Sequence, residues 1–418
     1  MTPARIEVDY LLETAFDPRQ AAEAMAGEQS SGTFVSVPGE TPELKARAAA
    51  RVEALRLIED AVAAPSLPFA GAPKDGPATW RRAHVTLSWP IDNIGPSLPN
   101  LLATIAGNLF ELKQVSGLRL LDLRLPESFA GRYPGPKFGI AGTRRLAGVA
   151  EGPLIGTIIK PSIGFDAEQT AALTKTLCEA GIDFIKDDEL QSDGPGCPFE
   201  DRVRAVMRVI NAHADRTGKK VMFAFNATGE LDEMRRRHDL LLAAGGTCIM
   251  ASLNSVGLVG FIELARFSQL PIHAHRNGWG YLTRHPLLGW SYVAWQKIWR
   301  LAGADHMHVN GLANKFSEPD ESVIASARAC LAPLFDSKPC QVMPVFSSGQ
   351  SAKQAPGTYA ALQSTDLIYT AGGGILAHPQ GPAAGVVALR EAWEAAVRGI
   401  SLKDYAAEHP ALAKALGA

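Results

Sequence analysis

The chain has 418 residues, of which 46% are hydrophobic and 20% charged, and this composition excludes a largely disordered protein. Its 41 Lys and Arg residues nearly balance 43 Asp and Glu residues, so a net charge of −2 provides no basic surface for nucleic acid or an anionic membrane. No uninterrupted apolar stretch reaches about 18 residues and no apolar leader is present, so the sequence predicts no membrane span and no secretion. Five scattered cysteines without metal-binding spacing indicate reduced thiols and a cytoplasmic protein.

The first 140 residues mix strands and helices without a regular repeat, which predicts a separate α+β domain of the ferredoxin-like type. In chain order we expect strands at 6–12, 33–37, 84–90 and 118–125, and helices at 18–27, 42–60 and 97–108. The stretch 133–139 is rich in proline and glycine and is the expected linker to a second domain, residues 141–418.

The second domain repeats one unit, which consists of a short apolar run, a polar or glycine-rich tip and an amphipathic segment. The eight runs with their tips are 154–160, 183–189, 221–228, 247–253, 271–276, 306–309, 341–349 and 367–374. Between them lie expected helices at 168–180, 200–216, 231–244, 286–301, 321–334 and 381–398. Eight such units over about 250 residues predict a closed (β/α)8 barrel (a TIM barrel), with a short helical tail after residue 398. An open doubly wound sheet is the alternative. Barrel chemistry takes place where the strands end, so the tips form the candidate site.

The second tip reads Lys186-Asp187-Asp188-Glu189. Because side chains alternate along a strand, Lys186 and Asp188 face the same way, with Glu189 at the exit. Adjacent carboxylates at a barrel mouth suit Mg²⁺, whereas an ammonium group is no metal ligand, so Lys186 would need a lowered pKa or conversion to a carbamate. The alternative is a charged turn with ordinary ion pairs.

Two pairs of histidines end neighbouring strands of the predicted barrel. His273 and His275 share one face of the fifth strand, with Arg276 after them, and His306 and His308 form the second pair, at the end of the sixth strand. Such imidazoles could bind metal, move protons or hold phosphate, with Arg276 as a partner for an oxyanion. Buried core histidines are the alternative.

The remaining tips carry cations and glycines. Lys315 lies in a glycine-containing loop that could close over a charged substrate, although a plain exposed loop is the simpler interpretation. Lys160 at the first tip could move protons or be a surface cation, and Asn226 could add a polar contact. The seventh and eighth tips, Phe346-Ser347-Ser348-Gly349 and Ala371-Gly372-Gly373-Gly374, are suited to phosphate. A metal, several cations and a phosphate cradle indicate enolisation of a phosphorylated keto compound.

Together these tips resemble the large subunit of ribulose-bisphosphate carboxylase/oxygenase (RuBisCO), and more closely its RuBisCO-like relatives, from about residue 5 to 398. The resemblance implies that Lys160 transfers protons and that carbamylated Lys186, with Asp188 and Glu189, holds Mg²⁺. It implies catalytic or substrate-binding roles for a further set of residues, namely His273, His275, Arg276, His308, Lys315, Ser347, Gly349, Gly372 and Gly373.

The resemblance also covers the first domain. The segment Glu28-Gln29-Ser30-Ser31-Gly32-Thr33 is similar to the family motif that supplies a glutamate and a phosphate-binding threonine, and Gly107-Asn108 is similar to its asparagine tip. In the family these residues reach the barrel of a partner subunit. The resemblance therefore implies a head-to-tail homodimer, or a higher oligomer, with shared active sites.

Several positions depart from the pattern of carboxylating members. Ser162 replaces a second lysine, Phe34 replaces a tryptophan, the loop 309–314 reads Val-Asn-Gly-Leu-Ala-Asn, and Ser348 replaces a glycine. CO₂ fixation on a bisphosphate is therefore not expected, whereas the parts for metal-assisted enolisation are retained.

Within the family, the expected reaction is decarboxylation of a branched sugar-acid phosphate of the 3-oxo-isoapionate 4-phosphate type. Loss of CO₂ from a β-keto acid gives the same metal-bound enediolate, so the retained parts suffice. The alternatives are the enolase or isomerase of methylthioribose salvage, which act on 2,3-diketo-5-methylthiopentyl 1-phosphate and 5-methylthioribulose 1-phosphate. A non-catalytic protein that binds a phosphorylated sugar is the alternative from another class.

Overall fold

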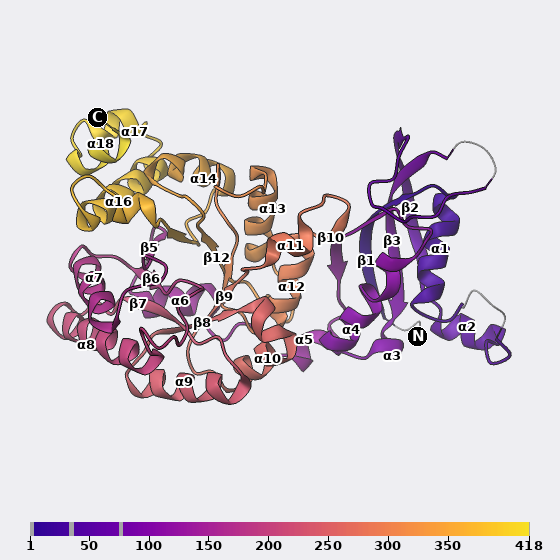
Figure 1. Ribbon diagram of the computed structural model, residues 1–418, viewed down its shortest axis with the longest axis horizontal. Coiled ribbons are helices and arrows are strands. Elements are labelled where there is room, and N and C mark those ends of the chain that lie inside the picture. The colour runs from indigo at the N-terminus through magenta and orange to yellow at the C-terminus, as the bar shows by residue number, and fades with distance from the viewer. Residues whose placement is uncertain (1–3, 33–36, 75–77, 418) are drawn as a thin grey trace. The chain divides into compact units, whose positions relative to one another are not determined.

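The computed structural model describes residues 4–32, 37–74 and 78–417 of the chain (Figure 1). The chain divides into two compact units. One contains Met1–Tyr133 and Gly278–Ile298, and the other contains Pro134–Asn277 and Trp299–Ala418. We expected a boundary near residue 140; the division lies between Tyr133 and Pro134, and a later segment of the chain belongs to the first unit.

The first unit is built on a mixed five-stranded sheet. Its strands are β1 (Arg5–Thr14), β2 (Arg51–Val62), β3 (Trp80–Pro90), β4 (Gly117–Arg124) and β10 (Leu288–Trp290). Its helices are α1 (Pro18–Glu28), α2 (Pro42–Ala48), α3 (Ile91–Ile94), α4 (Leu98–Ile105), η1 (Asn108–Glu111), α5 (Ser128–Arg132) and α11 (Trp279–Thr283). The strand order is β10-β4-β1-β3-β2, with β10 parallel to β4 and the other neighbours antiparallel. Alternate residues of β1 from Ile6 to Leu12 are buried, and α1 lies along the sheet (Figure 1), which confirms the α+β class.

Two expected helices are wrong in part. The helix expected at 42–60 ends at Ala48, and β2 follows as an edge strand paired with β3. Within the helix expected at 286–301, the residues of β10 pair with β4 before α12 (Tyr292–Ala302) begins. The residues of β2 favour helix locally, and pairing with β3 overrides that preference. The β10 segment contains Gly289, a poor helix former with a φ of +84°, so the expected helix started too early in the chain. Most of the strand expected at 33–37 lies outside the described residues.

The second unit is a closed parallel barrel, as predicted, and the open sheet is excluded. Its strands are β5 (Leu154–Ile158), β6 (Phe184–Lys186), β7 (Met222–Asn226), β8 (Cys248–Ser252), β9 (Ile272–His275), β11 (His306–His308), β12 (Met343–Phe346) and β13 (Ile368–Thr370). They follow one another round the barrel in chain order, and β13 pairs with β5 to close it. Each strand lies within one of the eight expected runs, because continuous burial gives parallel barrel strands an unbroken apolar pattern.

Helices surround the barrel (Figure 1). They are α6 (Gly139–Ala147), α7 (Ala167–Glu179), α8 (Phe199–Thr217), α9 (Leu231–Ala243), α10 (Leu253–Phe267), α12, α13 (Asp320–Leu331), η2 (Ala352–Gln354), α14 (Ala355–Leu362), α15 (Gly373–Leu376), α16 (Pro382–Arg398), α17 (Leu402–Ala406) and α18 (Pro410–Leu416). The tail after α16 is helical, as expected, and α18 packs against α16. Within the described ranges, no helix combines the length and the apolar character needed to cross a bilayer.

Burial of His306 in the barrel interior predicts a stability that depends on pH. His306 is fully buried, its Nε2 lies 2.9 Å from Thr143 Oγ1, and burial lowers its pKa from 6.5 to about 3. Between these values the unfolded chain binds a proton that the folded chain does not, so this contribution to stability is present above pH 6.5 and is lost as the pH falls toward 3.

We therefore expect His306→Gln to flatten the pH dependence. Relative to the wild type, the free energy of unfolding of the variant should gain about 2 kcal/mol between pH 6.5 and pH 5. Urea unfolding at a series of pH values measures this difference. Parallel curves for the two proteins would contradict a neutral, buried His306.

Candidate active site

The carboxyl ends of the barrel strands bring the predicted tips together at one mouth. Lys186 ends β6, Asn226 ends β7, His275 ends β9 and His308 ends β11, while Lys160 lies two residues beyond β5. Neighbouring strands are hydrogen-bonded in register, so residues far apart in the sequence become neighbours.

The densest charge at the mouth lies at the exit of β6. The side chain of Lys186 is only 1% exposed, its Nζ donates to the carbonyl of Asp187 at 2.8 Å, and it lies 3.7 Å from Oε2 of Glu189. Burial lowers the pKa of Lys186, and the neighbouring carboxylates of Glu189 and Asp188 oppose that shift. Asp188 Oδ2 accepts a hydrogen bond of 2.5 Å from Nζ of Lys160. The first and second predicted tips therefore form one cluster of two amines and two carboxylates.

Both carboxylates of this cluster are held in the ionised form. Burial is the largest single influence on the pKa of Asp188 and raises it, but the hydrogen bonds from Lys160 and the backbone N–H of Leu190, together with the charges of Lys186 and Lys160, make the net shift downward. Burial likewise opposes ionisation of Glu189, and the nearby His275 and Lys186 bring its pKa below the ordinary value. Asn226 Nδ2 donates to the backbone carbonyls of Asp188 and Glu189 at 3.3 and 3.1 Å, so β7 fixes the position of this segment.

Asp187 faces away from the cluster and forms a buried ion pair behind it. Its Oδ2 accepts from Arg202 Nε at 3.1 Å and from the backbone N–H of Asn226 at 2.9 Å. Arg202 also donates to the carbonyls of Cys197 and Ser192 at 3.0 and 2.7 Å. Because both charged groups are excluded from water, each needs the opposite charge of the other to stay ionised. The pair thereby fixes the position of the exit of β6.

We expect Arg202→Met to lower the free energy of unfolding by about 3–5 kcal/mol, because it leaves the carboxylate of Asp187 buried without its partner. Arg204→Met is a matched control, since Arg204 lies on the same helix with an exposed side chain. Urea denaturation of the two variants tests the prediction. Equal stability of the two variants would contradict it.

Three histidines form a neutral wall next to the charged cluster. The ring centroids of His275 and His308 are 4.5 Å apart, and that of His273 lies 6.1 Å from His308 and 6.3 Å from His275. Burial lowers the pKa of all three, that of His275 to about 4. His275 Nε2 lies 3.5 Å from Glu189 Oε2, and His308 Nε2 lies 2.7 Å from Ser347 Oγ. Neutral imidazoles can accept or donate hydrogen bonds here without adding charge.

Arg276, which sequence analysis named as an anion-binding residue, is paired within the protein. Its Nη2 donates to Oε2 of Glu318, and Asn310 Nδ2 donates to the same oxygen at 2.7 Å. The glutamate comes from the end of the loop that carries Lys315.

The loops after β11, β12 and β13 are joined closely. The backbone N–H of Lys315 donates to the carbonyl of Ser348 at 3.1 Å. A Cβ atom on Gly374 would lie 2.7 Å from the carbonyl oxygen of Gln350, so glycine permits this close approach of two loops. Around Gly373, in contrast, an added Cβ would meet no atom within 4 Å. Gly372 and Gly373 stand at the start of α15, where backbone N–H groups have no acceptor within the helix and can bind an anion.

The predicted residues of the first domain lie in the first unit. Asn108 Nδ2 donates to Oε1 of Glu28 at 3.2 Å, so these two come together. Thr33 lies outside the described residues.

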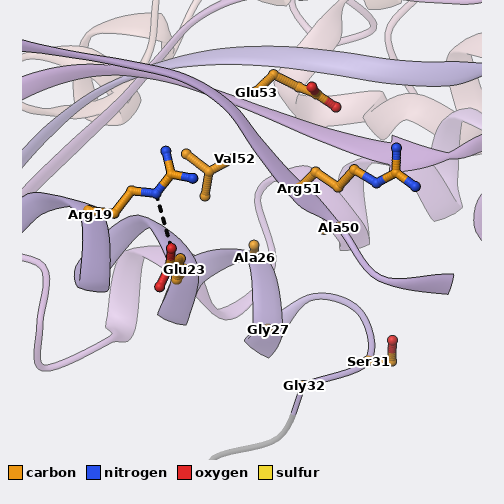
Figure 2. Close-up of a pocket in the computed structure, with 10 residues that line it drawn as sticks. All are labelled: Arg19, Glu23, Ala26, Gly27, Ser31, Gly32, Ala50, Arg51, Val52 and Glu53. Atoms are coloured by element: carbon orange, nitrogen blue, oxygen red, sulfur yellow. Dashed lines mark hydrogen bonds and ion pairs between the residues drawn. The ribbon is translucent and has the colours of Figure 1, made fainter. Parts of the chain in front are cut away.

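A surface hollow of about 490 Å³ borders the same motif, between α1 and the start of β2 (Figure 2). Arg19 and Glu23, which line it, form an ion pair of 3.0 Å with both side chains largely exposed. Arg51 and Glu53 add one further charge of each sign to the lining, so the hollow has no net charge preference. The hollow therefore offers less to an anionic substrate or a metal ion than the barrel mouth does.

Two residues that contribute to the site were not predicted from the sequence. Arg202 follows Phe199 by three residues and precedes Val206 by four, so it stands on the apolar face of α8, and a charge at such a position is a signal for a buried ion pair. Glu318 carries no comparable signal, because only the path of the loop brings it to Arg276.

The fold and the site define the class of protein. It is a (β/α)8 barrel whose mouth combines carboxylates, lysines, neutral histidines and a glycine-rich tip, preceded by an α+β unit. Family models support a closer assignment. Residues 139–418 match the catalytic domain of the ribulose bisphosphate carboxylase large chain, and residues 8–129 match its N-terminal domain. The chain belongs to this family, among its RuBisCO-like members.

The chain is similar over nearly its whole length to curated relatives. It is 63% identical to the 3-oxo-isoapionate-4-phosphate transcarboxylase/hydrolase of Xanthobacter autotrophicus, covering 99% of each chain. It is 46% identical to the 3-oxo-isoapionate-4-phosphate decarboxylase of Rhizobium rhizogenes, covering 98% of this chain and 97% of the relative.

Solved structures of the same family have the same fold as this chain. A RuBisCO-like protein from Burkholderia fungorum superposes with a TM-score of 0.92 at 49% identity, covering 99% of each chain. The dimeric archaeal RuBisCO of Hyperthermus butylicus superposes with a TM-score of 0.83 at 31% identity, covering 99% of this chain and 95% of that one.

Proposed function

We propose that the chain is a Mg²⁺-dependent enzyme that acts on 3-oxo-isoapionate 4-phosphate at the barrel mouth. The single observation that carries this proposal is the 63% identity, over 99% of both chains, to an enzyme named for that substrate. The cluster of Lys160, Lys186, Asp188 and Glu189 supports it, since a protein that only binds a sugar phosphate has no need of this set.

The residues of the cluster fit Mg²⁺ on one condition. Among the described residues, no three His, Cys, Asp or Glu side chains converge as a ready metal site. Asp188 and Glu189 supply two carboxylates, and Lys186 with its ammonium group would oppose a cation. A carbamate on Lys186 changes that charge from +1 to −1 and provides a third oxygen ligand of the kind Mg²⁺ prefers. Burial, which favours the neutral amine, is consistent with that modification.

When bound, Mg²⁺ would stabilise negative charge on the substrate oxygens next to the reacting carbon. The chain's own groups supply the rest. Lys160 Nζ, with a half-exposed side chain beside Asp188, is placed to deliver or remove a proton. The neutral imidazoles of His275 and His308 can hydrogen-bond substrate hydroxyl groups, and Ser347 fixes the orientation of His308. The N–H groups of Gly372 and Gly373 would hold the phosphate.

Two fates of the carboxyl group are candidates, each favoured by a relative. Decarboxylation, the reaction expected from the sequence, is the activity named for the relative at 46% identity. The relative at 63% identity is named a transcarboxylase/hydrolase, a reaction that is not among those expected from the sequence. Both break the bond to the carboxyl group. The first releases its carbon as CO₂, and transfer keeps that carbon in an organic product.

We also propose the head-to-tail homodimer that the resemblance implies, in which Glu28, Thr33 and Asn108 reach the partner's barrel. Apolar side chains in three barrel tips support it: Ile163, Leu190 and Phe316 are 54%, 67% and 57% exposed. Such residues around a polar site are typical of a surface that another protein covers. The five free, buried cysteines are consistent with a cytoplasmic location.

A panel of substrates tests the function. Protein treated with Mg²⁺ and bicarbonate is incubated with 3-oxo-isoapionate 4-phosphate, 2,3-diketo-5-methylthiopentyl 1-phosphate or 5-methylthioribulose 1-phosphate, and products are followed by NMR. We expect only the first to be consumed. With a ¹³C label in its carboxyl group, release of labelled CO₂ indicates decarboxylation, and retention of the label indicates transfer. Turnover of either methylthio compound alone would support methylthioribose salvage, and binding without turnover would support a non-catalytic protein.

A further inference from the structure

Among the anion-binding positions that the resemblance implies at the barrel mouth, Arg276 is already paired within the protein. In the proposed function the substrate phosphate binds at the glycine tip of Gly372 and Gly373, where an added Cβ on Gly373 would meet no atom within 4 Å. Arg276, in contrast, has a side chain that is only 5% exposed and is already paired with the carboxylate of Glu318. A second anion from the substrate would have to compete with that carboxylate.

Glu318 is held in place from several sides. Its Oε1 accepts from Ser322 Oγ at 2.8 Å, and Oε2 accepts from Asn310 Nδ2 at 2.7 Å in addition to Arg276. Its backbone carbonyl accepts from Asn314 Nδ2 at 3.0 Å. With a side chain only 14% exposed, Glu318 is a fixed part of the mouth.

The hydrogen bonds continue from Glu318 to the next loop. Asn310 Oδ1 accepts from Ser348 Oγ at 2.7 Å, and Ser348 Oγ lies 3.2 Å from Ser347 Oγ, which contacts His308. Asn310 and Ser348 are two of the positions at which the sequence departs from the carboxylating pattern. Asn310 and Ser348 thus contact each other, and Asn310 helps to hold the carboxylate of Glu318 that is paired with Arg276.

We propose that Glu318 is a specificity-determining residue: it fills the Arg276 position with a resident carboxylate and limits the substrate to one phosphate group, bound at the glycine tip. A second phosphate would meet the like charge of Glu318 and could not pair with Arg276. The inference deepens the proposed function and rests on it, because 3-oxo-isoapionate 4-phosphate carries a single phosphate whereas family members that carboxylate act on a bisphosphate.

Calorimetric binding of ribulose 1,5-bisphosphate and ribulose 5-phosphate to Mg²⁺- and bicarbonate-treated protein tests the proposal. Glu318→Gln removes the charge and keeps an oxygen for Asn310. Glu321→Gln is the matched control, since Glu321 is exposed on α13. We expect the wild type and the control to bind the two ligands with similar affinity. Glu318→Gln should bind the bisphosphate at least tenfold more tightly than the wild type does, with affinity for the monophosphate unchanged within threefold.

The double variant Glu318→Gln/Arg276→Met should lose this gain, because the second phosphate needs the guanidinium group. If Glu318→Gln does not fold, Asn310→Gly, which suits the backbone φ of +70° at that position, removes one donor to Glu318 and should shift the preference in the same direction. Equal gains for both ligands, or no gain in a folded variant, would overturn the proposal. Absence of turnover of 3-oxo-isoapionate 4-phosphate would instead count against the proposed function, since ligand preference is measured without turnover.

Discussion

Lys186→Ala is expected to reduce turnover of 3-oxo-isoapionate 4-phosphate by more than about 100-fold, since even the outer partners of metal ligands are worth 10–100-fold. Lys186 is the buried amine between Asp188 and Glu189, and without it the cluster has only two carboxylates to hold Mg²⁺. Measured against Mg²⁺ concentration, the variant should require far more metal for any residual activity, and bicarbonate should no longer stimulate it.

Lys175→Ala is the matched control, because Lys175 is an exposed lysine on α7 that pairs only at the surface with Glu179. The control should keep wild-type activity and wild-type dependence on Mg²⁺. A Lys186→Ala protein that turns over substrate at the wild-type rate after treatment with EDTA would exclude Lys186 from a metal site.

Lys160→Met is expected to lower kcat by about 10²–10⁴-fold, the usual contribution of a positioned acid or base. Its Nζ lies 2.5 Å from Asp188 and 2.7 Å from Ser162 Oγ, so the ammonium group also competes with a cation for Asp188. The variant should therefore bind Mg²⁺ at least as tightly as the wild type, as measured by calorimetry.

The two readouts separate a role in proton transfer from a role in the metal site. A loss of kcat with Mg²⁺ affinity unchanged or increased supports proton transfer by Lys160. A loss of Mg²⁺ affinity together with the loss of kcat would contradict a role of Lys160 in proton transfer. Ser162→Ala is the control, since it removes the neighbouring hydroxyl group and leaves the lysine in place.

The barrel could be predicted from the sequence because its strands are buried throughout and leave continuous apolar runs, each ending in a polar tip. Register between neighbouring strands then brought Lys160, Lys186, His275 and His308 to one mouth, as expected. The strand β2 was not predicted, because its residues favour helix locally and only pairing with β3 makes it a strand. The strand β10 was not predicted because its three residues show no periodic pattern and it forms by pairing with β4.

The hydrogen bonds and ion pairs that site residues form with one another could not be predicted from the sequence either. Arg276 was interpreted as an open anion-binding residue, but the loop that carries Lys315 turns back and places Glu318 against it. The hydrogen bond between Asn310 and Ser348 likewise joins two loops that lie 38 residues apart. Such contacts depend on loop geometry, which residue periodicity does not encode.

In the proposed function the barrel mouth turns over 3-oxo-isoapionate 4-phosphate with Mg²⁺ held at Lys186, Asp188 and Glu189. The most direct measurement is the rate of substrate consumption by wild-type protein, first stripped of metal and CO₂ and then given Mg²⁺ and bicarbonate together. We predict negligible consumption by the stripped protein and full activity after both are restored, with no such recovery in Lys186→Ala. Equal consumption by stripped and restored protein, or none under either condition, would contradict the claim.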